Sequence, residues 1–174
     1  MSASACDATS SSASDRADPR VPASPRGPIV TGMSYYQTLI EEASGATARA
    51  LELARPRPDL SYTGTVGAAL VTATGVLHTG VNLSLMCGIG FCAEHSAVAN
   101  MVAAGESRIA RIAAVTSTGA VLPPCGRCRE LLYQIDPGNL DTEVVLAPDR
   151  SAPLGKLLPA IWQDATDVPL PGAG

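Results

Sequence analysis

Two segments of the chain share one local design, and this design restricts the possible folds more than any other feature. In each, a β-rich run leads through a loop to a cysteine that opens a predicted helix: FCAEHSAVANM at residues 91–101 and PCGRCRELLYQI at 124–135. Cys125 and Cys128 are three residues apart, so they point to the same side of a helical turn. If the strands before the two helices are parallel, both helix starts lie at one end of the sheet, where α/β proteins bind ligands.

A zinc site is the chemistry that these residues favour. The positive end of a helix dipole favours thiolate over thiol, and thiolate is the form that binds zinc. Cys92, Cys125 and Cys128 would leave the fourth position of a tetrahedral ion open, which is typical of a catalytic zinc. Glu94 shares a helix face with apolar residues, where a bare carboxylate is costly unless it is paired or used. Beside a zinc-activated water it could accept a proton and return it to a leaving nitrogen.

The hydrophobic spacing predicts a domain in which strands and helices alternate. We expect helices over 34–54, 92–104, 125–135 and 154–162, two strands within 65–83 on either side of Gly75, and strands over 109–117 and 142–147. Alternation after the first two strands predicts helices packed on a largely parallel sheet.

The composition sets the domain limits and excludes several classes of function. Residues 1–32 are rich in Ser, Ala, Pro and Asp, which predicts a disordered extension, followed by a domain over 33–165 and a flexible tail over 166–174. No apolar run reaches about 18 residues, so we expect no membrane span, and no export signal is present. The net charge of −4, with scattered basic residues and few aromatic ones, disfavours nucleic-acid binding. Reduced thiols in the cytoplasm then favour a metal or catalytic role for the cysteines.

Two other readings of the cysteines remain open from the residues alone. Cys125 and Cys128 could form a redox pair, although this would leave Cys92 and Glu94 unused. A closed structural zinc site would need a fourth ligand, for which Cys87, His78 and His95 are the candidates.

The two motifs also carry a resemblance to a known family. Cys92-Ala93-Glu94 together with the run from Pro124 to Arg129 resembles the zinc-dependent cytidine deaminase superfamily, above all small cytidine deaminases and blasticidin S deaminase. The resemblance covers about residues 34–162 and includes the flanking segments VGAAL at 66–70, GVN at 80–82 and LGKLLPAIW at 154–162. It implies an α/β fold in three layers, α/β/α, with a mixed sheet of about five strands and helices on both faces.

The resemblance further implies a function and roles for single residues. It implies hydrolytic deamination of a cytosine nucleoside, with one zinc ion per subunit and with Glu94 moving protons to N3 and to the leaving amine. Asn82 would bind the sugar, and backbone groups near Ala93 and Pro124 would hold the base. Trp162 would either reach a neighbouring subunit's pocket or serve as a core or interface aromatic. A cytoplasmic homotetramer is expected, and the apolar stretch 83–91 would suit an interface.

The chain also departs from this family's pattern at four places. Where the family usually has N-x-E, this chain has Asn82-Leu83-Ser84, and where it usually has Phe two residues before VGAAL, this chain has Gly64. His95 stands in place of a frequent Arg after C-A-E, and Cys128-Arg129-Glu130 stands in place of CRQ. These departures favour a cytidine-like nucleoside with an altered sugar, or a relaxed pocket. The blasticidin S type is therefore one alternative. Alternatives of other classes are a nucleic-acid editor, a purine-ring deaminase, which would usually have H-A-E, and a non-catalytic structural zinc domain.

Overall fold

The computed structural model describes residues 34–53 and 62–162. The expected extension 1–32, the expected tail 166–174 and the outer ends of the predicted domain lie outside these ranges. The elements in chain order are α1 (Ser34–Leu53), β1 (Tyr62–Thr72), β2 (Leu77–Ser84), the 3-10 helix η1 (Met86–Gly88), α2 (Ala93–Ala103), β3 (Ile109–Thr116), α3 (Gly126–Ile135), the 3-10 helix η2 (Pro137–Asp141), β4 (Glu143–Ala147), β5 (Arg150–Pro153) and α4 (Leu154–Leu157). No helix in the described part is long and apolar enough to cross a bilayer.

The five strands form a mixed sheet, as the family resemblance predicted, and their order is β2-β1-β3-β4-β5. The expectation of a largely parallel sheet is wrong, because β3 and β4 are the parallel pair and the other neighbours are antiparallel. The reason is that β1 inserts between β2 and β3 and runs opposite to both. Since β2 and β3 then share one direction, their carboxyl ends still lie at the same end of the sheet, and the α2 and α3 starts follow them.

Strand β5 was not predicted, and the last helix is shorter than predicted. The segment Arg150–Pro153 has no β-branched or aromatic residue, but it pairs with β4 from Glu143 to Ala147. The pairing, and not local propensity, makes it a strand. Helix α4 then ends at Leu157 instead of at Trp162.

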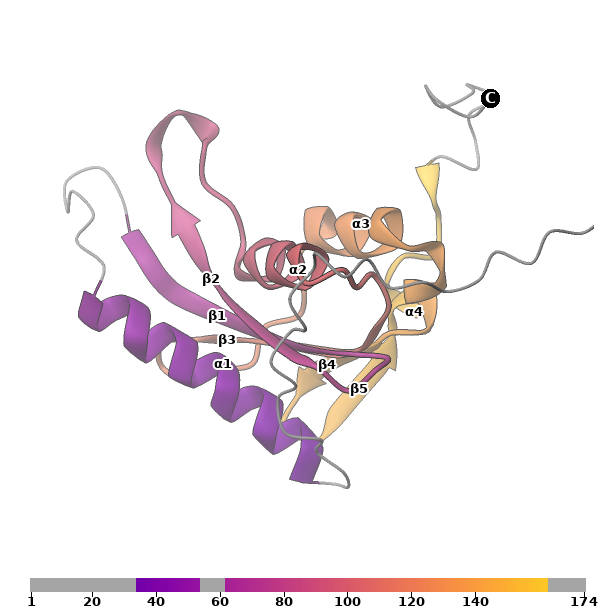
Figure 1. The fold of residues 1–174 in the computed structure, drawn as a ribbon, viewed down its shortest axis with the longest axis horizontal. Coiled ribbons are helices and arrows are strands. Elements are labelled where there is room, and N and C mark those ends of the chain that lie inside the picture. Colours follow the sequence, from indigo (N-terminus) through magenta and orange to yellow (C-terminus); the bar gives the residue numbers. More distant parts are fainter. Residues whose placement is uncertain (1–33, 54–61, 163–174) are drawn as a thin grey trace, which may run out of the picture.

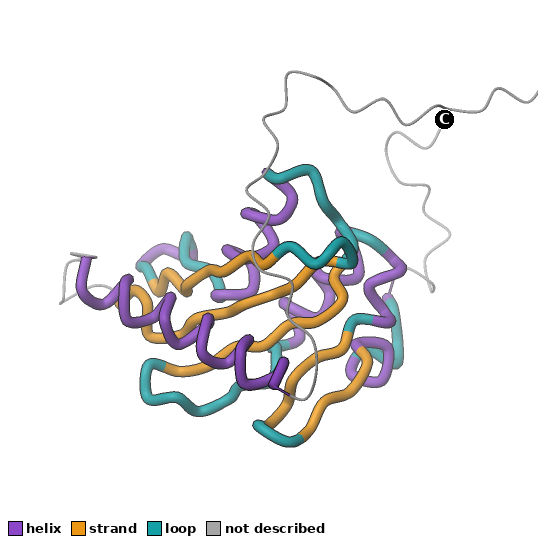
Figure 2. The backbone as a smooth tube through the Cα atoms, turned by 60° about the horizontal axis from the view of Figure 1, so that its bottom comes forward, coloured by secondary structure: helices purple, strands orange, loops and turns teal. Residues whose placement is uncertain are grey.

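Alternate residues of the central strands feed two separate cores, one on each face of the sheet. Figure 1 shows α1 on one face and α2 and α3 on the other, and Figure 2 shows the long helix lying across the strands. The core under α1 contains Leu39, Ala43, Ala69, Val71, Ala113, Val115 and Val145. The core under α2, α3 and α4 contains Ala68, Leu70, Ala97, Met101, Ile112, Ala114, Leu132, Val144 and Leu154, with others. This two-residue period confirms the three-layer α/β/α architecture.

Two glycines let the helices approach the sheet closely. A Cβ on Gly67 in β1 would lie 2.1 Å from the Ala43 carbonyl oxygen of α1, and one on Gly80 in β2 would lie 2.3 Å from the Ala97 nitrogen of α2. No other residue fits there without moving backbone. Gly80 therefore fixes α2, and with it the start of the Cys-Ala-Glu segment, against the sheet.

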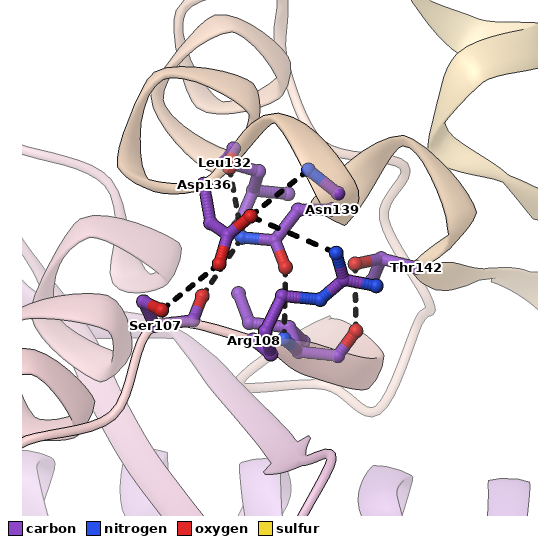
Figure 3. Close-up of polar contacts among 8 residues, drawn as sticks. Ser107, Arg108, Leu132, Asp136, Asn139 and Thr142 are labelled. Carbon is purple, nitrogen blue, oxygen red and sulfur yellow. Dashed lines mark hydrogen bonds and ion pairs between the residues drawn. The ribbon is translucent and has the colours of Figure 1, made fainter. Parts of the chain in front are cut away.

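A buried asparagine joins α3 to β3 (Figure 3). Asn139 is fully buried, and its Oδ1 accepts a hydrogen bond from the Ile109 backbone N–H at 2.8 Å. Its Nδ2 donates to the carbonyl oxygens of Ser107 at 3.0 Å and Leu132 at 2.9 Å. Asp136 adds a second link, because it accepts from the Ser107 hydroxyl at 2.9 Å. The side chain of Asn139 thus supplies partners for backbone groups that water cannot reach.

We predict that Asn139→Ala lowers the free energy of unfolding by about 2–4 kcal/mol, because the buried Ile109 N–H loses its acceptor. Urea denaturation measures this. Asn100→Ala is the matched control, because Asn100 is exposed and donates one hydrogen bond, to the Thr79 carbonyl oxygen. The control should cost less than about 1 kcal/mol. Equal costs for the two variants would contradict the role assigned to Asn139.

Candidate active site

The sulfur atoms of Cys92, Cys125 and Cys128 come together at the starts of α2 and α3. The Cys92 and Cys125 Sγ atoms are 3.8 Å apart, those of Cys125 and Cys128 are 3.4 Å apart, and all three lie within 4.8 Å of one another. Tetrahedral zinc with Zn–S bonds of about 2.3 Å requires sulfur–sulfur distances of about 3.8 Å. The three sulfurs therefore fit one zinc ion without movement of the backbone.

The local structure leaves these sulfurs free to bind a metal. Cys92 and Cys125 are the N-cap residues of α2 and α3, and neither side chain makes a capping hydrogen bond. Cys128 lies in the first turn of α3 and is fully buried. Burial is the main cause that raises the pKa of Cys128 well above its usual range. The negative charge of Glu94 and the neighbouring thiols raise it further. A divalent cation would reverse this effect, since a metal deprotonates the thiols that bind it.

The described residues contain no fourth side chain that would close the site. Among residues 34–53 and 62–162, the cluster of possible metal ligands consists of the three cysteines alone. His78 instead contacts Glu106, at 3.4 Å, and Cys87 is exposed and outside the cluster. His95 is also outside it, and its buried Nε2 has no hydrogen-bond partner. Three ligands leave one coordination position open, as in catalytic zinc sites.

Glu94 is the buried carboxylate next to these sulfurs. It lies in the first turn of α2 and is 6% exposed. Burial raises its pKa above the ordinary value for a glutamate, although hydrogen bonds from its own backbone and from Cys128 oppose the rise. A raised pKa brings a carboxyl group closer to the pH at which it has to both accept and donate a proton, as general acid–base catalysis requires.

A cavity of about 630 Å³ opens onto Cys92, Cys125 and Glu94. Such a volume is within the usual range for small-molecule sites. Its lining consists of Val66, Asn82, Leu83, Ser84, Leu85, Met86, Gly88, Gly90, Phe91, Cys92, Ala93, Glu94, Ala114, Leu122, Pro123, Cys125 and Arg127. The lining is mainly apolar, with Asn82, Ser84, Glu94 and Arg127 as its polar side chains besides the cysteines.

The comparisons with known proteins agree with this geometry. The family model described as the cytidine and deoxycytidylate deaminase zinc-binding region matches residues 40–143, a range that includes the three cysteines and Glu94. The chain belongs to this deaminase family. A cytidine deaminase from Mycobacterium tuberculosis is 37% identical over 95 residues, which are 54% of this chain and 69% of that protein. This membership confirms the predicted superfamily, a hydrolytic deaminase, and zinc as the cofactor.

Solved structures of the family support the same fold. The crystal structure of cytidine deaminase from Mycobacterium tuberculosis is 31% identical with a TM-score of 0.60, and the alignment covers 73% of this chain and 96% of that one. The cytidine deaminase from Mycobacterium leprae gives 31% identity, a TM-score of 0.59, and coverage of 72% and 98%. The deaminase fold therefore extends over nearly the whole of these relatives.

The structure brings most of the site residues predicted from the sequence to the cavity, but not all of them. Asn82 and Ala93 line it beside Cys92, Glu94 and Cys125. Pro124 is buried and lies next to Glu94 in a smaller pocket, and its carbonyl oxygen accepts a hydrogen bond from Arg129 Nε at 2.8 Å. Trp162 is 57% exposed and is not among the residues that line the cavity.

The cavity wall includes a segment whose place the sequence reasoning did not predict. We expected 83–91 to suit a subunit interface, which stays a prediction; seven of its residues line the cavity, which the sequence reasoning did not predict. Two backbone hydrogen bonds hold Phe91 there: its N–H donates to the Leu83 carbonyl oxygen at 2.8 Å, and its carbonyl oxygen accepts from the Leu83 N–H at 3.0 Å. It is the single phenylalanine of the chain and directly precedes Cys92, which is the signal that could have identified it. Gly64 lies elsewhere, with φ +75° and a Cβ direction blocked by Ala50 of α1.

The two arginines of the second motif have different environments. Arg129 donates from Nε to the Pro124 carbonyl oxygen and from Nη1 to the Leu157 carbonyl oxygen at 3.0 Å, so it fastens the loop before Cys125 to α4. Arg127 is exposed and lines the cavity. Burial and the charge of Arg127 together lower the pKa of His95. Arg129 therefore holds the cysteine loop in place, and Arg127 brings positive charge to the thiolate side of the cavity.

We predict that Cys128→Ser reduces bound zinc from about one ion per chain to well below half after dialysis, because it removes the buried sulfur of the cluster. Mass spectrometry of the metal content measures this. Cys87→Ser is the matched control and should keep its full zinc content, since Cys87 is exposed outside the cluster. Full zinc retention by Cys128→Ser would contradict the three-sulfur site.

Proposed function

We propose that the chain is a zinc-dependent hydrolase that converts cytidine or deoxycytidine, with one water, to the uracil nucleoside and ammonia. The observation that carries this proposal is that Glu94 and a three-sulfur cluster with an open fourth position share one cavity of nucleoside size. The relatives that the chain matches are named cytidine deaminases, which gives the substrate class. A closed structural zinc domain would need neither a cavity nor a buried carboxylate beside the metal.

In this proposal Cys92, Cys125 and Cys128 would hold the zinc ion. When bound, zinc supplies a Lewis acid that lowers the pKa of a water and makes it a nucleophile at neutral pH. The buried Glu94 accepts a proton from that water and delivers protons to N3 of the cytosine ring and to the 4-amino nitrogen. The water oxygen bonds to C4 of the ring, the bond from C4 to the 4-amino nitrogen breaks, and the amine leaves as ammonia. The raised pKa of Glu94 suits this exchange, because the carboxyl group has to be protonated in one step and ionised in the next.

The chain's other residues bind and orient the nucleoside. We assign backbone groups at Ala93 and Pro124 to the edge of the base, since both lie against Glu94. The apolar wall of Phe91, Leu122 and Ala114 excludes water from the ring. We assign Asn82, which lines the cavity near the carboxyl end of β2, to the sugar.

The remaining assignments concern assembly and location. We propose a cytoplasmic homotetramer in which Trp162 reaches a neighbouring subunit's pocket. The 57% exposure of Trp162 supports this. The exposure of Met86 and Ile89, three residues apart in the segment 83–91, also supports it, because exposed apolar residues that cluster mark interaction sites. The net charge of −4 supports a free nucleoside over a nucleic acid as the substrate.

We predict that Glu94→Gln lowers the rate of ammonia release from cytidine by at least about 10²–10⁴-fold, because glutamine cannot carry the proton. The variant should keep its zinc, since Glu94 is not a member of the cluster of ligands. Glu41→Gln on the exposed side of α1 is the control and should match the unsubstituted protein. A protein that binds zinc but releases no ammonia in any form would instead be the structural domain.

We also predict the order of substrates in an ammonia-release screen run with zinc quantified. Cytidine and deoxycytidine should be deaminated, and free cytosine and guanine should not. Blasticidin S tests the altered-sugar alternative, which Ser84 at the cavity wall motivates. Turnover of blasticidin S far above that of cytidine would replace the present proposal with that alternative.

A further inference from the structure

The segment that leads to Cys92 is a closed loop of backbone. After β2 ends at Ser84, the chain turns back, and Phe91 forms an antiparallel bridge with Leu83 of the same strand. Both hydrogen bonds of this bridge are present, from the Phe91 N–H at 2.8 Å and from the Leu83 N–H at 3.0 Å. Residues 84–90 therefore form a loop whose two ends are fixed to each other.

This loop gains little stability from side-chain packing. None of the residues 84–90 is buried, and its 3-10 helix η1 contains Cys87 in the left-handed region, at φ 62°. A segment with few buried apolar contacts opens locally at a low cost in free energy. The direction in which the loop hands the chain to α2 therefore depends on the bridge at its base.

Gly90 is the residue on which the bridge depends. A Cβ at this position would lie 2.3 Å from the Leu83 carbonyl oxygen and 2.9 Å from the Leu85 nitrogen. The Leu83 carbonyl oxygen is the atom that accepts the hydrogen bond of Phe91, so a side chain at 90 would occupy the space of the bridge itself. Both atoms belong to the backbone, so a change of rotamer cannot relieve the contact, and only glycine permits this approach.

The bridge adjoins one of the three sulfur-bearing residues. Gly80 fixes α2 against the sheet, but Cys92 precedes that helix, with φ −72° and ψ 160°, so the place of its sulfur also depends on Phe91 before it. The other two sulfurs come from the start of α3, which the loop does not include. A zinc site tolerates deviations of only about 0.2 Å in its metal–ligand distances. A small shift of the bridge would therefore take one sulfur of three out of reach.

We propose that Gly90 is a positioning residue of the metal site, which acts through the Leu83–Phe91 bridge to hold the Cys92 sulfur at the ion. The inference rests on the three-sulfur zinc site of the proposed function and not on the choice of substrate. A larger residue at 90 loosens Cys92 alone, because the other two cysteines belong to the start of α3.

The first experiment loads Gly90→Ala with Co²⁺ in place of zinc. The charge-transfer absorption from sulfur to Co²⁺ grows with the number of bound thiolates, so it reports how many cysteines bind. Gly90→Ala should lose about one third of this absorption, since one ligand of three is displaced. Its zinc affinity, measured by competition with a chelator, should fall at least about tenfold, as for residues that orient a metal ligand.

Gly126→Ala is the matched control for Gly90→Ala. Gly126 lies directly after Cys125 in the other cysteine segment, and a Cβ there would have nothing within 4 Å. The control should keep the full absorption and the full zinc affinity.

A double-variant cycle with Cys92→Ser separates positioning from a general loss of structure. If Gly90 acts through Cys92, Gly90→Ala should cost zinc affinity in the unsubstituted protein and nothing more in the Cys92→Ser background, where that ligand is already gone. A merely structural role would lower the affinity by the same factor in both backgrounds. The melting temperature of the metal-free proteins verifies folding.

Hydrogen exchange in the unsubstituted protein decides the question if Gly90→Ala does not fold. Coupling between two sites is reciprocal, so zinc should slow exchange of the Phe91 and Leu83 amides at least about fivefold. The Thr72 amide, which donates to the Val76 carbonyl oxygen in the turn at the opposite end of β2, is the reference. Equal slowing at all three amides, or no slowing at the bridge, would overturn the inference.

The remaining outcomes separate this inference from the site it rests on. If Cys92→Ser loses about one third of the absorption but Gly90→Ala keeps all of it and its zinc affinity, the bridge does not position Cys92 and the inference is wrong. Equal losses of zinc affinity in both backgrounds of the cycle also contradict it. If Cys92→Ser keeps the full absorption, the three-sulfur site of the proposed function is itself wrong.

Discussion

The meeting of three sulfur atoms at two helix starts is the interaction on which the site depends. Cys92 precedes α2, and Cys125 and Cys128 begin α3, so they meet only if β2 and β3 deliver the chain to the same end of the sheet. The antiparallel β1 between them achieves this, because two strands that both oppose β1 share one direction. Three thiolates repel one another, so a cation between them would stabilise the approach of the two helix starts as well as supply chemistry.

Close packing of α2 on the sheet gives Glu94 its properties. Gly80 allows the backbone of α2 at Ala97 to approach β2 more closely than any side chain would permit. Glu94, one turn before Ala97 on the buried side, is thereby removed from water, and burial is the main cause of its raised pKa. Gly80 on β2 thus contributes to the raised pKa of Glu94 on α2.

The residue types and spacing were enough to predict the elements and the metal ligands. Patterns of three and four residues located the helices, and a cysteine at each helix start indicated the sulfur cluster that the structure contains. Strand direction was not predictable in this way, because a buried apolar run such as Val66–Leu70 has the same sequence pattern whether its neighbouring strands are parallel or antiparallel. Strand β5 and the cavity wall at 85–90 were missed because backbone pairing, and not residue type, determines both: β5 pairs with β4, and Leu83 pairs with Phe91.

Two walls of the cavity are built from different parts of the fold. One consists of helix starts, whose positive dipole ends and buried positions determine the charge beside the sulfur atoms. Another includes a strand irregularity, where Asn82 replaces a ladder bond and donates a hydrogen bond to the Ser84 hydroxyl. A substitution at Ser84 would leave the sulfur atoms and Glu94 where they are, because no bond of Ser84 reaches the helix starts. The strand wall of the cavity can therefore change in this fold while the three sulfur atoms and Glu94 stay in place.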